Sequence, residues 1–204
     1  MDHYKALEKK WGQIFASMDH RELQKRFSLE EDNQALYITY FQQRYGINKA
    51  GEGITLMEDP GRELSFQTVM AIYHLFYYSR PEARIRGEFV PFRLVKRAAP
   101  FEAAYQRNIL EPLARSFDGH LEELKRACQA LGGRPVPQGD VGCVIDAFSC
   151  MPLTFVFWDG DEEFRAQANI LFDADITDFL HEETVVLVAE ELARRLKEEA
   201  GLAG

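Results

Sequence analysis

The sequence predicts an α+β fold with mostly antiparallel sheet, built from an N-terminal meander and a C-terminal hairpin and packed with about five to six helices. At residues 35–57 and again at 151–173, the side-chain pattern repeats every two residues, which is typical of strands. Apolar residues recur at helical spacing in most of the remaining chain. The length of 204 residues suits one domain, and no linker or repeat divides it, so we expect residues 1–204 to form a single α+β domain.

The first third of the chain predicts two helices and then the meander. Apolar residues at helical spacing mark the first helix, namely Tyr4, Leu7, Trp11, Phe15 and Met18. Asp19 and Glu22 form a capping box for a short second helix. Strands are then expected near 35–41, 43–48 and 53–57, and the glycines of the loop at 49–52 can supply positive φ.

The middle of the chain predicts a central helix and an extended edge segment. Ser65 can cap a helix over 66–78, which is apolar around most of its circumference and should therefore be central. Pro81 prevents its continuation. Pro91 lacks the N–H that a central strand requires, so residues 89–94 are expected to form an edge strand or an extended loop.

Further helices and the last strands follow. Pro100 suits the start of a helix that Pro112 should kink or restart, and Gly132 with Gly133 should end the next helix. A strand is expected at 141–148. The final helix should run from about Glu182 to Glu199, with its charges outward and four aliphatic residues inward: Val185, Val188, Leu192 and Leu196.

The hairpin at 151–173 allows a prediction of register. A one-residue slip turns every side chain of a strand to the opposite face, so an even-numbered loop is needed to place the Phe155 side of the first strand with the apolar side of the second. A four-residue loop from Asp159 to Glu162 satisfies this requirement. It places Phe157 opposite Phe164.

Composition and charge narrow the classes of function. A net charge of −9 repels phosphate backbones and argues against general nucleic-acid binding. The longest aliphatic run is far shorter than the roughly 20 residues of a membrane span, so we expect no membrane insertion. Three cysteines without a CxxC pair, and an N-terminus unlike a signal peptide, favour a soluble cytoplasmic protein. No cofactor is identified, since GxGxxG and GxxxxGK[ST] are both absent.

One basic segment stands out in this acidic chain. Between residues 80 and 97, only Glu82 and Glu88 oppose six basic residues, which are Arg80, Arg84, Arg86, Arg93, Lys96 and Arg97. Guanidinium groups suit carboxylates and phosphates, so Arg84, Arg86 and Arg93 could hold an anionic small molecule. The alternative is that these arginines pair with carboxylates of neighbouring elements.

Other candidate sites have structural alternatives. His74 and Tyr77 could line an aromatic pocket for acid/base chemistry, or simply belong to a core helix. The acidic residues at 159–163 could bind a hard cation, or form a solvated loop; we assign no metal site. Cys150 beside Ser149 is the one suggestive nucleophile, and burial as a small apolar residue is the alternative, so no catalytic residue is assigned.

Two blocks of sequence resemble an uncharacterised prokaryotic family, the domain of unknown function 3786. The first block runs from Gly87 to Arg93 and the second comprises 152–153, 158–164, Ala166, 170–173 and 176–180. The family has no established activity and no catalytic residues to transfer. The resemblance implies a bacterium, mostly among anaerobes, and some members look fused to a cysteine-rich iron–sulfur module whose cysteines this chain lacks.

The sequence therefore supports two hypotheses of function. The first is a non-catalytic binding or accessory protein that recognises an anionic small ligand or a protein partner through Arg84, Arg86 and Arg93, with His74 and Tyr77 nearby. The second is an enzyme with an acid/base site at His74 that acts on a small anionic metabolite. Self-association into a homo-oligomer, through a sheet edge or a helix, is a further hypothesis.

Overall fold

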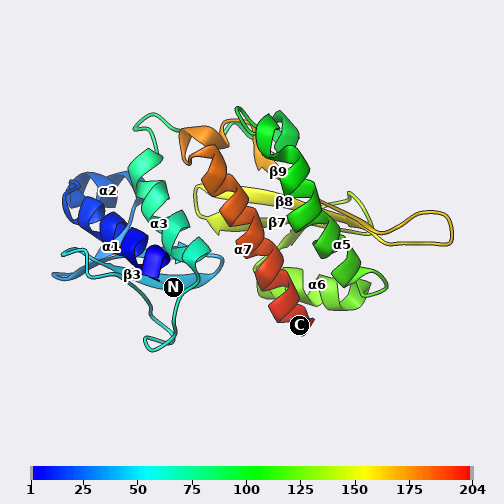
Figure 1. Ribbon diagram of the computed structural model, residues 1–204, viewed down its shortest axis with the longest axis horizontal. Helices are drawn as coiled ribbons and strands as arrows, with labels where there is room; N and C mark the ends of the chain where they lie inside the picture. Colours follow the sequence, from blue (N-terminus) through cyan, green and yellow to red (C-terminus); the bar gives the residue numbers. More distant parts are fainter. Residues whose placement is uncertain (1, 203–204) are drawn as a thin grey trace.

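The computed structural model describes residues 2–202, with side chains from Tyr4 onward. It is an α+β fold, as predicted, with two antiparallel sheets and helices packed around them (Figure 1). The helices are α1 (Asp2–Ala16), α2 (His20–Phe27), α3 (Phe66–Tyr78), α4 (Glu102–Tyr105), α5 (Glu111–Phe117), α6 (Leu121–Ala130) and α7 (Glu182–Ala200). The strands are β1 (Glu30–Glu31), β2 (Ala35–Tyr40), β3 (Gln43–Asn48), β4 (Ile54–Leu56), β5 (Phe89–Pro91), β6 (Arg134–Pro135), β7 (Val141–Phe148), β8 (Met151–Trp158) and β9 (Gln167–Asp173).

The first sheet has the order β1-β2-β3-β4 and confirms the predicted meander. Its tight β2–β3 turn contains Phe41 and Gln42, whose φ angles are 44° and 64°. Two consecutive left-handed residues are what a two-residue hairpin turn of this twist requires. The short β1, which the sequence did not indicate, pairs with β2 at the edge.

The second sheet has the order β5-β9-β8-β7-β6, and β5 is an edge strand, as Pro91 predicted. In the β8–β9 pair, Phe155 lies opposite Ile170 and Phe157 lies opposite Ala168. The prediction that the Phe155 side of β8 shares a face with the apolar side of β9 is therefore confirmed. The predicted four-residue loop, with Phe157 opposite Phe164, is wrong.

The loop is longer because its acidic residues form contacts of their own. Asp161 Oδ1 accepts hydrogen bonds from the amides of Glu163 and Phe164, at 2.8 and 2.7 Å. Asp159 Oδ1 accepts one from the amide of Gly119, at 2.8 Å, in the connection between α5 and α6. The loop projects beyond the body of the molecule (Figure 1), and Phe164 is 64% exposed within it.

The helix α3 begins and ends where the sequence predicts. Ser65 Oγ accepts a hydrogen bond from the amide of Thr68, at 3.1 Å, which caps its first turn. Before Pro112 the predicted interruption takes the form of a π turn (Gln106–Leu110), in which the amide of Glu111 donates to the carbonyl of Gln106. The wider turn accommodates a proline inside an otherwise continuous helical segment.

The helix α7 lies between the two halves of the molecule and packs against α3 and α6 (Figure 1). Val185, Val188, Leu192 and Leu196 are buried, as predicted. The prediction that the charges of this helix all face outward is wrong, because Glu191 and Arg195 are only 1% and 5% exposed. Buried side chains of both halves form one continuous cluster. No helix among the described residues is long and apolar enough to cross a membrane.

Candidate functional site

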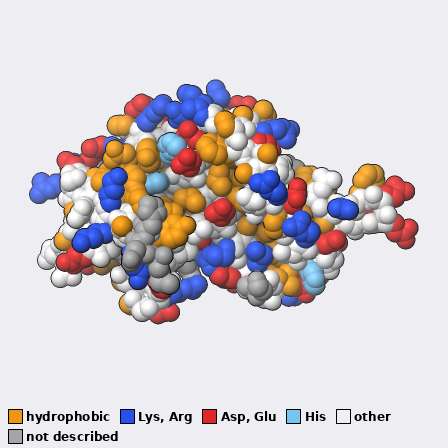
Figure 2. Space-filling model, viewed as in Figure 1, with side chains coloured by type: hydrophobic (Ala, Val, Ile, Leu, Met, Phe, Trp, Pro, Cys, Tyr) orange, Lys and Arg blue, Asp and Glu red, His pale blue; other side chains and the backbone are white. Residues whose placement is uncertain are grey.

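The basic segment, residues 80–97, runs along the edge of the second sheet. It follows α3, contains the edge strand β5, and continues into a 3₁₀ turn (Phe92–Leu94) that carries Arg93. Figure 2 shows Lys and Arg side chains gathered along the upper edge of the molecule, where Figure 1 places this segment. The candidate arginines therefore lie on one short stretch of surface.

A buried carboxylate fixes the backbone of the basic segment. Asp173, at the end of β9, is 4% exposed. Its Oδ2 accepts a hydrogen bond from the amide of Gly87 at 2.7 Å, and its Oδ1 accepts one from the amide of Arg86 at 3.2 Å. The amide of Ala174 donates to the carbonyl of Glu88, at 2.8 Å. The two sequence blocks that resemble the family thus meet as the β5–β9 pair.

Part of the positive charge of this segment is neutralised by neighbouring carboxylates. Three of its basic side chains make ion pairs: Arg80 with Asp178 at 2.8 Å, Arg97 with Glu182 at 3.5 Å, and Arg86 with Glu88 at 3.6 Å and with Asp175 at 3.8 Å. These pairs are largely exposed, so each contributes at most about 1 kcal/mol to stability. Pairing within the protein accounts for these three positions.

The other three basic side chains have no carboxylate partner among residues 2–202. Arg84 is exposed, and its Nη1 donates to the carbonyl of Ala83 at 2.7 Å. Arg93 and Lys96 are exposed and make no hydrogen bond or ion pair with the described part of the chain. Arg84, Arg93 and Lys96 are therefore available to an external anion.

His74 and Tyr77 lie together on α3, against α1. The centroid of the His74 imidazole is 4.3 Å from that of the Trp11 ring, and the centroid of the Tyr77 phenol ring is 5.1 Å from it. The Nδ1 of His74 is hydrogen-bonded to Thr184 Oγ1 at 2.7 Å, and its Nε2 is buried without a partner among the described residues. Burial, with a smaller contribution from His181, lowers the pKa of His74 to about 4.

The structure does not connect this aromatic group to the arginines. No hydrogen bond or ring contact within residues 2–202 joins His74 or Tyr77 to Arg84, Arg86 or Arg93. Tyr77 is half-exposed, whereas His74 is mostly enclosed by aromatic rings and Thr184. At neutral pH this histidine is uncharged.

A buried polar network, which the sequence reasoning missed, links the two halves of the molecule. Arg195 donates to Glu191 Oε1 at 2.7 Å, to Tyr45 Oη at 2.7 Å and to Gln43 Oε1 at 2.8 Å. Glu191 Oε1 also accepts from Thr68 Oγ1 on α3, at 3.0 Å. A signal was present in the sequence, because Glu191 and Arg195 are each three residues from an aliphatic position of the buried stripe of α7.

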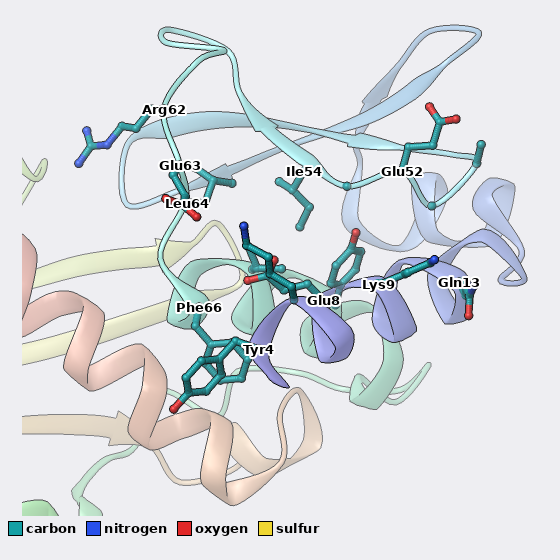
Figure 3. Close-up of a pocket in the computed structure, with 16 residues that line it drawn as sticks. Tyr4, Glu8, Lys9, Gln13, Glu52, Ile54, Arg62, Glu63, Leu64 and Phe66 are labelled. Carbon is teal, nitrogen blue, oxygen red and sulfur yellow. The ribbon is translucent and has the colours of Figure 1, made fainter. Parts of the chain in front are cut away.

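Residues 62–64 line two hollows of the surface. The larger, of about 830 Å³, lies between α1, the β3–β4 turn and the start of α3 (Figure 3). The smaller, of about 290 Å³, lies beside the Arg195 network. Within the described residues, no group of three or more His, Cys, Asp or Glu side chains is arranged to hold a metal ion.

Two of the four acidic residues in the loop at 159–166, Asp159 and Asp161, accept hydrogen bonds from backbone amides. The hydrogen bonds from the amides of Phe164 and Glu163 lower the pKa of Asp161. Asp159 Oδ1 accepts from Gly160 as well as from Gly119. These contacts give the acidic residues a role in the conformation of the loop.

Comparison with known proteins places the chain in a family without assigning an activity. Comparison with curated proteins and with solved structures found no match. A family model described as a domain of unknown function, DUF3786, matches residues 19–195 and so includes the basic segment, both sheets and α7 as far as Arg195. The chain belongs to the DUF3786 family.

Proposed function

We propose that the chain is a single-domain, non-catalytic binding or accessory protein whose basic segment recognises an anionic small ligand or an acidic protein partner. One observation carries this proposal. Arg84, Arg93 and Lys96 are exposed and lack carboxylate partners within residues 2–202, although the chain has a net charge of −9. Cationic side chains left unpaired in an acidic protein suit an external anion.

The backbone beneath these side chains supports the proposal. Asp173 holds the amides of Arg86 and Gly87, and β5 is paired with β9 immediately before Arg93. A ligand that binds there does not have to order the backbone first, which lowers the entropic cost of binding. Arginine adds two parallel donors that match the oxygens of a carboxylate or phosphate.

Titration calorimetry with pyrophosphate and with citrate tests this proposal. Each lost charge-assisted hydrogen bond should cost about 1.5–3 kcal/mol, so Arg84→Ala and Arg93→Ala should each weaken binding by roughly 10- to 100-fold. Arg86→Ala should weaken it less, because Arg86 already faces Glu88 and Asp175. Binding should also weaken as salt is added.

The matched control is Arg126→Ala on α6, which removes an exposed arginine far along the chain from the basic segment. It should leave anion binding unchanged. Absence of binding by both anions at millimolar concentration, or equal losses in Arg126→Ala and Arg93→Ala, would reject the basic segment as the binding surface. A protein partner would then be sought elsewhere on the molecule.

The alternative proposal is an enzyme with acid/base chemistry at His74. The observation that favours it is the buried Nε2 of His74, which has no partner among the described residues. A general base works best when its pKa lies near the working pH, and burial has moved this one to about 4. An NMR titration of His74 in the presence of citrate is decisive: a pKa that rises toward 7 supports catalysis, and one that stays near 4 supports a role in the core.

We also propose a cytoplasmic location, in an anaerobic bacterium. Cys128, Cys143 and Cys150 are all free thiols in the structure, which supports a reducing compartment. We propose, in addition, that the chain can self-associate through an exposed surface, and sedimentation velocity of the purified chain tests this.

A further inference from the structure

The larger hollow, here called the α1 cleft, has the size of a small-molecule site. Its volume of about 830 Å³ falls within the range of roughly 300–1,000 Å³ typical of ligand pockets. α1 forms one side, the β3–β4 turn with Ile54 forms another, and Leu64 and Phe66 close the end at the start of α3 (Figure 3). It is separate from the basic segment, none of whose residues lines it.

The backbones of α1 and of the β3–β4 turn are in direct contact beside the cleft. A Cβ atom on Gly12 would lie 2.4 Å from the carbonyl oxygen of Gly51. A Cβ atom on Gly51, whose φ is +79°, would lie 2.4 Å from the carbonyl oxygen of Gly12. Only glycine at both positions allows this approach. The distance between the two walls is therefore fixed by the backbone.

A buried hydroxyl lies at the base of the cleft. Tyr73 lines it, is 2% exposed, and its Oη has no hydrogen-bond partner among the described residues. The hydroxyl lies 3.4 Å from the position that a Cβ on Gly12 would occupy. Burial, together with the charge of Glu8, raises the pKa of Tyr73 to about 12, so the hydroxyl stays protonated at neutral pH. A buried polar group without a partner is costly, so a ligand group that bonded to this hydroxyl would gain free energy.

Glu8 is the charged residue that acts on this hydroxyl. Burial, and then the charge of Glu63, raises the pKa of Glu8, while Lys5 offsets part of the effect. In Figure 3, Glu8 and Ile54 point toward each other across the cleft, whereas Arg62 and Glu52 point away from it. The charged residues that line the cleft are Lys5, Glu8, Lys9, Glu52, Arg62 and Glu63. Two carboxylates that repel each other, as Glu8 and Glu63 do, gain from a shared cation.

The other walls suit an apolar body. Ile54, Leu64 and Val69 line the cleft from three different segments. The ring of Phe66 packs against that of Tyr4, 4.7 Å away between centroids, at the lower end in Figure 3. Aromatic faces also attract ammonium groups.

We propose that the α1 cleft binds a small organic amine, whose ammonium group lies near Glu8, Glu63 and the hydroxyl of Tyr73 and whose apolar body packs against Ile54 and Phe66. The ammonium donates to Glu8 and to the oxygen of Tyr73, so the buried hydroxyl gains its missing partner. A carboxylate ligand would add a third negative charge beside Glu8 and Glu63.

Titration calorimetry compares 2-phenylethylamine with 3-phenylpropionate, which has a similar body and the opposite charge. The amine should bind and the carboxylate should not. Glu8→Gln and Tyr73→Phe should each weaken amine binding about tenfold or more, because each removes a partner of the ammonium group. Glu52→Gln is the control, since Glu52 lines the same cleft but points away from it, and it should bind the amine as the unaltered protein does.

A second readout follows from the proton on Glu8. An ammonium group lowers the pKa of a nearby carboxyl, so near pH 5 amine binding should release protons, and this release should be absent in Glu8→Gln. Binding of the carboxylate as tightly as the amine, no amine binding at millimolar concentration, or unchanged binding in Glu8→Gln would each overturn the proposal. Arg93→Ala should leave amine binding intact, which separates this test from that of the basic segment.

Discussion

The substitution Arg195→Ala would remove the centre of the polar network that links the two halves of the molecule. Arg195 is 5% exposed, and its guanidinium group contacts Glu191 on its own helix and Tyr45 on β3. It also donates to Gln43 Oε1 and, at 3.2 Å, to the carbonyl of Phe41 in the β2–β3 turn. Alanine would remove the Arg195 donor from all of these acceptors, although Glu191 and Gln43 each keep another donor.

The expected cost follows from the burial of the pair. Removing one partner of a buried ion pair costs about 3–5 kcal/mol, because an uncompensated charge stays behind. Arg194 also donates to both carboxylate oxygens of Glu191, at 2.6 and 3.0 Å, so that charge keeps one partner. We therefore expect a loss near the lower limit, about 3 kcal/mol. For a chain of this size, such a loss lowers Tm by roughly 6–12 °C.

Urea unfolding followed by circular dichroism, together with scanning calorimetry, measures this loss. Arg115→Ala is the matched control: Arg115 is exposed on α5 and lies 3.8 Å from Glu111, so its loss should cost less than about 1 kcal/mol. A difference of less than about 1 kcal/mol between Arg195→Ala and Arg115→Ala would refute the view that this network joins the two halves.

Three further predictions concern His74, Gly12 and Asp173. The folded-state pKa of His74 is about 4 and an unfolded histidine titrates near 6.5, so the unfolded state binds the proton first as the pH falls. The free energy of unfolding should therefore fall by about 2–3 kcal/mol more in the unaltered protein than in His74→Gln between about pH 7 and about pH 4. Urea titration at each pH measures this difference. Gly12→Ala should lower stability by about 1–3 kcal/mol, seen as a lower Tm, because its Cβ would meet the carbonyl of Gly51; an unchanged Tm would contradict the backbone contact. Asp173→Ala should cost about 1–3 kcal/mol and speed hydrogen exchange of the Gly87 amide, whereas unchanged exchange would show that Asp173 does not fix the basic segment.

Elements with local signals could be predicted from the sequence. The helix α3 is bounded by Ser65, whose hydroxyl caps it, and by the approach to Pro81, so both limits lie within a few residues of the helix itself. The two-residue period of the meander similarly predicts its strands. Capping and periodicity depend on neighbours along the chain, which a sequence displays directly.

The hairpin shows where local reasoning ends. The shared faces of β8 and β9 followed from parity, which survives a change in loop length by an even number of residues. The residue-by-residue pairing of the two strands could not be predicted, because Asp159 makes contacts with distant segments. Its carboxylate accepts a hydrogen bond from the amide of Gly119, in the connection between α5 and α6, and its own amide donates to Asp140. Contacts between segments set where the strands end.

For the candidate sites too, features set by neighbours along the chain could be predicted, and features set by contacts between distant segments could not. The excess of positive charge at 80–97 was visible in the sequence, but the pairing of Arg80, Arg86 and Arg97 depends on carboxylates that folding brings near. Arg195 was placed on the outside of α7 because its partner Tyr45 is 150 residues away. The α1 cleft was not predicted, since its walls come from four separate segments.

Amide chemical-shift mapping by NMR tests the central proposal, that the basic segment binds an anion. Pyrophosphate and citrate are titrated separately into the protein and into Arg93→Ala. The proposal predicts saturable shifts concentrated at residues 80–97, which weaken in the variant. Shifts concentrated outside this segment, or none with either anion at millimolar concentration, would contradict it.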